Sequence, residues 1–85
     1  MKERTQYQIQ EIRRQAEEWI EYGFKVSFID NLGVYITFKK TYSPLKFDAI
    51  KWDGTKETWG LGKFTNTMNV WLQNPTTNLE IERRS

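Results

Sequence analysis

The chain contains no histidine and no cysteine, so any catalysis would have to rest on carboxylates, lysines or tyrosines. Imidazole and thiol groups carry out most acid–base, nucleophilic and metal-binding chemistry near neutral pH. The candidate carboxylates are Asp30, Asp48 and Asp53. Asp30 and Asp53 are typical of turns, and no spacing brings two carboxylates together as a catalytic pair. We therefore predict that the protein is not an enzyme and needs no metal and no cofactor.

Residues 60–63, Gly-Leu-Gly-Lys, hint at a phosphate-binding loop. A P-loop needs a glycine five residues before its Gly-Lys pair and a hydroxyl residue after it. This chain has Glu57 and Phe64 at those two positions. Two glycines around one residue are more typical of a bend or bulge in a strand, so the segment does not predict a nucleotide site.

Lysine and tryptophan are interleaved between positions 51 and 63. The members of this group are Lys51, Trp52, Lys56, Trp59 and Lys63. Indole faces beside ammonium groups suit stacked bases of a single-stranded nucleic acid, and they suit a protein hot spot equally well. The alternative is that both tryptophans belong to the core. Four Trp, four Tyr and five Phe exceed what one small core needs, so at least one of Trp52 and Trp59 is expected to be exposed.

Positive charge is concentrated in the middle of the chain, although the formal net charge is only +2. Residues 23–63 carry seven lysines against four acidic residues, a net of +3, while residues 1–22 net −1. Such a segment can attract an acidic surface or a phosphate backbone. It falls short of the dense basic stripe of a dedicated nucleic-acid binder, and the alternative is a solvated sheet face.

A helix over residues 6–22 is the clearest predicted element. Its apolar stripe has helical spacing and consists of Ile9, Ile12, Ala16, Trp19 and Ile20. Thr5 is a suitable N-cap, and Gly23 suits the left-handed position after the last turn.

A hairpin over residues 24–40 follows, because the apolar period changes to two. A loop at 31–33 places Phe28 opposite Ile36 and Val26 opposite Phe38, which puts all four on one face. The other face holds Lys25, Lys39, Tyr35 and Ile29 and is expected to be wet. Lys25, Lys39 and Tyr35 therefore join the candidate partner-binding residues.

A second hairpin over 47–61 is predicted around Asp53-Gly54, the strongest short turn signal of the chain. The loop length stays open between two and three residues, and a slip of one residue exchanges which of Trp52 and Trp59 faces the core. Segment 64–73 has helical spacing but many poor helix formers. We favour a strand there, in a C-terminal hairpin over 67–82 with Leu72 opposite Leu79.

The predicted fold class is α+β, with an N-terminal amphipathic helix packed on an antiparallel β-meander of five or six strands, in a single small domain over residues 1–85. No apolar run is long enough to span a bilayer, and the missing cysteines fit a cytoplasmic location without membrane contact.

Small size, absent catalytic groups and surplus aromatic residues favour a non-enzymatic protein-binding module, an inhibitor or adaptor that acts by surface occlusion. In type, the chain is similar to short accessory proteins of phages and mobile elements, such as anti-CRISPR and anti-restriction proteins. The alternative is a single-stranded DNA- or RNA-binding protein that uses the lysine–tryptophan hairpin. A homodimer, formed through an exposed sheet edge, is a third hypothesis.

Overall fold

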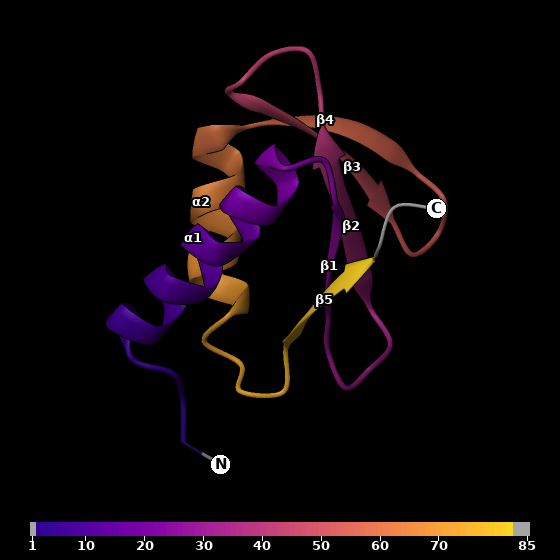
Figure 1. Cartoon of the computed structure of the whole chain (residues 1–85). Coiled ribbons are helices and arrows are strands. Elements are labelled where there is room, and N and C mark those ends of the chain that lie inside the picture. The colour runs from indigo at the N-terminus through magenta and orange to yellow at the C-terminus, as the bar shows by residue number, and fades with distance from the viewer. Residues whose placement is uncertain (1, 83–85) are drawn as a thin grey trace.

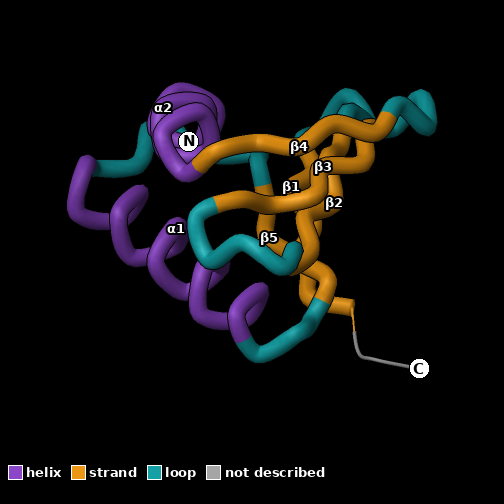
Figure 2. Tube along the Cα trace, turned by 90° about the horizontal axis from the view of Figure 1, so that it is seen from above, coloured by secondary structure: helices purple, strands orange, loops and turns teal. Residues whose placement is uncertain are grey.

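The computed structural model describes residues 2–82. Its elements are α1 (Gln6–Glu21), β1 (Lys25–Ile29), β2 (Tyr35–Lys40), β3 (Lys46–Lys51), β4 (Lys56–Gly60), α2 (Leu61–Trp71) and β5 (Asn78–Glu82). The strands form one antiparallel sheet in the order β4-β3-β2-β1-β5. Both helices lie on the same side of this sheet (Figures 1 and 2). The α+β class with an N-terminal helix on an antiparallel sheet is thus confirmed.

Helix α1 begins with a capping box and ends at a left-handed glycine. The Thr5 Oγ1 accepts a hydrogen bond from the Gln8 backbone N–H, and the Gln8 side chain accepts one from the Thr5 N–H. Gly23 has a φ of 97°. Ile9, Ala16 and Ile20 are buried as predicted. Trp19 is 38% exposed, however, because it lies at the border of the stripe, where its ring meets Phe24 edge to face.

The β1–β2 hairpin has the predicted register. Val26 pairs with Phe38 and Phe28 with Ile36, and all four side chains are buried. Asp30 fixes the turn, since its Oδ1 accepts hydrogen bonds from the backbone N–H groups of the loop at 2.9 and 3.1 Å.

The β3–β4 hairpin has a three-residue loop. The Lys51 N–H donates to the Thr55 carbonyl, and the Gly54 N–H donates to the Lys51 carbonyl, both at 2.9 Å. Gly54 has a φ of 86°, as this loop type requires. The resulting register places Trp59 opposite Phe47 on the helix side, where it is only 3% exposed. Trp52 lies in the loop and is 50% exposed.

The predicted C-terminal hairpin over 67–82 is wrong. Residues 61–71 form helix α2, and β5 pairs with β1, which sets Leu79 opposite Phe28. Burial favours a helix over a strand in this segment, because the helical arrangement places Phe64, Met68 and Leu72 in the core with no exposed surface. This burial outweighs the weak helix propensity of the threonine and asparagine residues between them. Strands β1–β4 form the meander, and the fifth strand returns beside β1.

The core between the sheet and the helices is mainly aromatic. The Phe38 ring lies 5.2 Å from the Trp59 ring and 4.9 Å from the Phe64 ring, between ring centroids. Phe28 and Phe47 complete this cluster. These five aromatic side chains are buried and therefore belong to the core. Within residues 2–82, neither helix has the length and apolarity needed to cross a membrane.

Candidate functional site

The sheet face opposite the helices carries no covering element among residues 2–82 (Figure 2). We call it the open face. Strand alternation and the pairing registers assign it these side chains: Lys25, Ser27, Ile29, Tyr35, Thr37, Lys39, Lys46, Asp48, Ile50, Lys56, Thr58, Asn78, Glu80 and Glu82.

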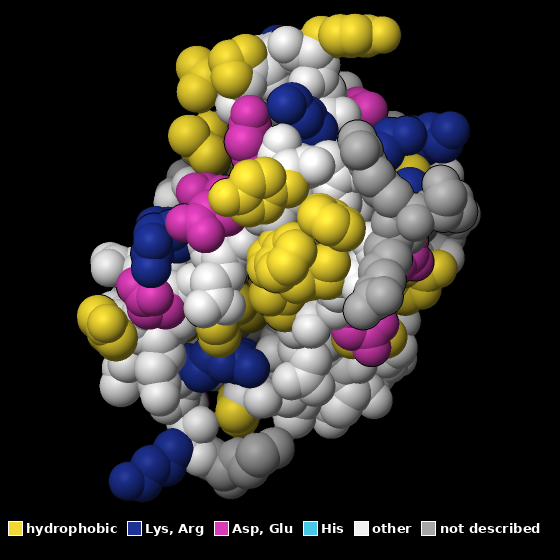
Figure 3. Space-filling model, in the orientation of Figure 1, with side chains coloured by type: hydrophobic (Ala, Val, Ile, Leu, Met, Phe, Trp, Pro, Cys, Tyr) yellow, Lys and Arg dark blue, Asp and Glu magenta, His cyan; other side chains and the backbone are white. Residues whose placement is uncertain are grey.

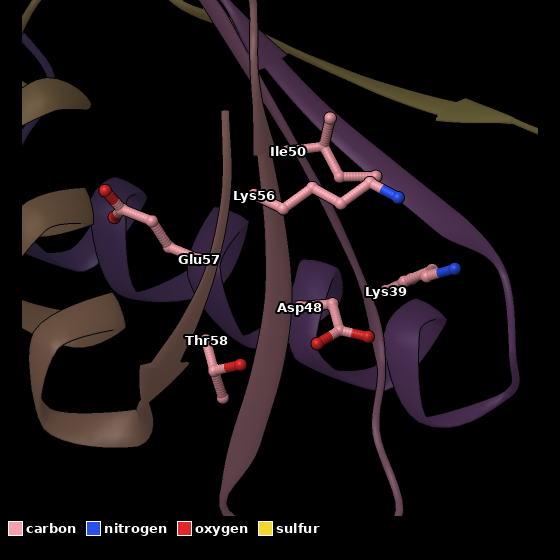
Figure 4. Close-up of a pocket in the computed structure, with 6 residues that line it drawn as sticks. All are labelled: Lys39, Asp48, Ile50, Lys56, Glu57 and Thr58. Carbon is pink, nitrogen blue, oxygen red and sulfur yellow. The ribbon is translucent and has the colours of Figure 1, made fainter. Parts of the chain in front are cut away.

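Two adjoining hollows mark the open face. The larger, of about 730 Å³, is lined by Lys25, Lys39 and Lys46 together with residues of the β2–β3 loop. The smaller, of about 240 Å³, is lined by Lys39, Asp48 and Lys56 among others. Figure 4 shows the side chains of Lys39, Lys56 and Asp48 directed away from the helices, whereas that of Glu57 is directed toward them. We refer to the two hollows together as the groove.

Four lysines of the open face lack an acidic partner. Lys25, Lys39, Lys46 and Lys56 are exposed, and none forms a salt bridge or a side-chain hydrogen bond with any residue between 2 and 82. Two carboxylates line the groove: Asp48, which is equally unpaired within that range, and Glu57, which is paired with Lys51 and Lys63. Among residues 2–82, four unpaired lysines therefore stand against one unpaired carboxylate, which leaves this surface with a net positive charge.

Acidic side chains elsewhere are largely used within the molecule. On α1, the pairs are Arg13–Glu17, Arg14–Glu11 and Arg14–Glu18, and Glu21 pairs with Lys40. Glu80 and Glu82 lie on β5, at the far edge of the open face, opposite Ser27 and Lys25. Positive charge is consequently greatest over β2, β3 and β4.

Two aromatic side chains lie at one end of the open face. Tyr35 is 39% exposed, and the Trp52 backbone N–H donates to the Tyr35 carbonyl at 3.0 Å, so the two residues are neighbours across β2 and β3. Neither ring contacts another aromatic ring or a cation among the described residues. Trp52 is 50% exposed, so part of each side chain remains accessible to a partner.

The structure divides the predicted lysine–tryptophan group. Trp52 and Lys56 belong to the exposed part of the hairpin and to the open face. Trp59, Lys51 and Lys63 lie around Glu57, on the helix side of the sheet. The Trp59 Nε1 donates to Glu57 at 2.8 Å, and the Lys63 ammonium lies 4.7 Å from the Trp59 ring centroid. These three residues do not join the open face.

The cluster around Glu57 stabilises structure and is unsuited to proton transfer. A hydrogen bond from Lys51, whose Nζ lies 2.9 Å from the carboxylate, and the bond from the Trp59 N–H lower the pKa of Glu57 to about 2. A general acid or base needs a pKa near the working pH. Glu57 instead stays ionised and ties β4 to the start of α2 through Lys63.

Sequence reasoning missed Lys46 and the position of Asp48 in the groove. Asp48 pairs with Lys39 on one side and Thr58 on the other, and Lys46 has the same strand parity. The β2–β3 register would have revealed both, but the chain between these strands carries no hairpin signal that sets it. Among the described residues, no group of three or more acidic side chains could hold a metal ion.

Comparisons with protein-family models, with curated proteins and with solved structures give no match. The functional argument therefore rests on the open face. Its features are a sheet supported by the core, a groove that includes four lysines without salt bridges to residues 2–82, and two partly exposed aromatic side chains at one end. This arrangement offers charged and aromatic contacts for binding.

Proposed function

We propose that the protein is a non-enzymatic binding module that occupies the surface of an acidic macromolecular partner through its open face. The observation that carries the proposal is the set of four exposed lysines around one groove that form no salt bridge within residues 2–82. The basic residues Arg13 and Arg14 of α1 form salt bridges with neighbouring glutamates, whereas Lys25 and Lys39 form none with the acidic residues opposite them in the sheet, Glu82 and Asp48. The unpaired lysines of the open face are therefore available to bind acidic groups of a partner.

A module of this kind acts by covering what it binds, as an inhibitor or as an adaptor. The open face belongs to a sheet whose other side is held by the core, so its side chains are positioned before the partner arrives. Such preorganisation lowers the entropic cost of binding. The missing cysteines favour a cytoplasmic site of action.

The test compares two variants with the same change in charge. Lys39→Gln combined with Lys46→Gln removes two positive charges from the groove, and Lys2→Glu changes the net charge by the same amount in the segment before α1. Each is titrated at low salt, by fluorescence anisotropy, with labelled poly-L-glutamate and with labelled single-stranded DNA. We expect the parent to bind at least one probe, and the groove variant to bind it at least about fivefold more weakly.

The Lys2→Glu variant should bind like the parent. Equal weakening in both variants would mean that net charge alone governs binding, and the open face would lose its role. Failure of the parent to bind either probe would contradict the proposed function outright.

A protein partner at a different surface is the second candidate. The end of α1 and the adjacent sheet edge present Trp19, Tyr22, Phe24 and Ile81, of which Tyr22 is 70% exposed. The Trp19 ring stacks edge to face on both Tyr22 and Phe24. Figure 3 shows hydrophobic side chains gathered between α1 and the sheet. Exposed aromatic clusters of this composition are typical of protein-binding hot spots.

A further inference from the structure

We infer that the acidic partner of the open face is a single-stranded nucleic acid, whose bases stack on Trp52 and Tyr35 while its backbone follows the lysines of the groove. This inference rests on the proposed function and names the chemical class of the partner. It draws on three independent features: the free aromatic rings, the spacing of the lysines and the position of Asp48.

The aromatic end of the open face supplies a stacking platform. Trp52 directly follows β3 and its backbone N–H donates to the carbonyl of Tyr35 on β2, so the two residues are cross-strand neighbours, about 4.8 Å apart as in paired strands. One extended strand of nucleic acid can therefore reach both rings with nearby bases. Stacking of this kind tolerates any base, because every base has a π face, and it needs bases that are not already paired in a duplex.

The lysines of the open face lie in successive rows that begin next to that platform. Lys56 lies opposite Ile50, and Lys39 lies in the next row on the same face, opposite Asp48. Lys46 is one row farther along β3. Successive rows are two residues, or about 6.8 Å, apart, so the platform and the three lysines span roughly 20 Å along the strands. That length accommodates a few nucleotides, in the range of small single-strand binding surfaces.

Asp48 favours a nucleic acid over an acidic protein. Its carboxylate lies in the groove without a partner of its own among residues 2–82, and it repels a phosphate or a glutamate placed directly above it. The exocyclic amino groups of bases donate hydrogen bonds to carboxylates. A single strand can thus present a base edge to Asp48 and phosphates to the flanking lysines, whereas acidic side chains match only the lysines.

The experiment measures binding of a mixed-sequence single-stranded DNA of about ten nucleotides, of its duplex and of poly-L-glutamate at several salt concentrations. We compare the parent with Trp52→Ala, Trp52→Phe and Tyr35→Thr. Threonine is chosen at position 35 because it removes the ring and has a high strand propensity. Tyr7→Ala is the matched control, because Tyr7 is an exposed aromatic residue on α1, away from the open face.

We expect the parent to bind the single strand more tightly than the duplex, with an affinity that falls steeply as salt rises. Trp52→Ala and Tyr35→Thr should each weaken binding about 5- to 150-fold, Trp52→Phe should restore most of it, and Tyr7→Ala should leave it unchanged.

Four results would overturn the inference. If the protein binds poly-L-glutamate but not the single strand, the partner is an acidic protein and not a nucleic acid. The proposed function would still hold in that case. Equal affinity of the parent for single strand and duplex, or undiminished binding by both aromatic variants, would remove the stacking platform. Binding of no probe at low salt would overturn the inference and the proposed function together.

Discussion

Trp59→Ala is expected to lower the free energy of unfolding by about 3–5 kcal/mol, whereas Trp52→Ala should lower it by less than about 1 kcal/mol. Trp59 is 3% exposed, packs against Phe38 and donates a hydrogen bond to Glu57. Its removal leaves a cavity in the aromatic core. It also removes one of the hydrogen bonds that the Glu57 carboxylate accepts. Trp52 has half of its surface in solvent, so its loss creates no cavity.

Urea unfolding followed by far-ultraviolet circular dichroism measures both values. A small domain has a total stability of roughly 5–15 kcal/mol, so the Trp59 variant should be close to unfolded at moderate denaturant. Trp59→Phe is the control, because it keeps most of the apolar volume and loses only the indole N–H. A larger loss for Trp52→Ala than for Trp59→Ala would show that the β3–β4 loop holds the other register, and similar losses would contradict the difference in burial.

Arg4→Ala is expected to lower the free energy of unfolding by about 2–3 kcal/mol. The Arg4 guanidinium donates to the carbonyls of Leu72, Asn74 and Thr77 at 3.2, 2.9 and 2.7 Å. These carbonyls lie at the end of α2 and in the connection to β5. The last carbonyls of a helix lack intrahelical partners, and a positive charge there also complements the helix dipole.

The variant Arg4→Lys separates the contribution of the guanidinium hydrogen bonds from that of the positive charge. A lysine keeps the charge but donates from a single nitrogen, whereas Arg4 reaches the three carbonyls from two separate nitrogens, so this variant should recover only part of the loss. Hydrogen exchange should show the effect locally, as faster exchange of the β5 amides in Arg4→Ala. If Arg4→Lys is as stable as the parent, Arg4 acts through its charge alone. If Arg4→Ala has the same free energy of unfolding as the parent, Arg4 does not stabilise the α2–β5 connection.

Where local signals agreed, the sequence predicted the structure well. Helix α1 combines apolar spacing with a capping residue, and the β1–β2 register follows from strict alternation on both sides of the loop at Gly33. The Asp53-Gly54 turn located the second hairpin, but its arms alternate poorly. Only the three-residue loop of the structure decides that Trp59 is core and Trp52 is surface.

Where the outcome depends on distant contacts, sequence reasoning could not succeed. Segment 64–72 carries a helical apolar pattern on residues with weak helix propensity, and only its burial against the sheet resolves the conflict. The contact of Arg4 with the α2–β5 connection joins residues about seventy positions apart. Likewise, the place of Lys46 in the candidate site depends on the β2–β3 register, which the sequence did not predict.

The most direct test of the open face as the contact surface is a two-dimensional ¹H–¹⁵N NMR titration with the single-stranded DNA. We predict shift changes at the Trp52 indole and at amides of the open face in β2 and β3, centred on Tyr35, Lys39 and Asp48. Amides of α1 should stay unchanged. Shift changes confined to the surface around Trp19 and Tyr22, or no changes at low salt, would contradict the account.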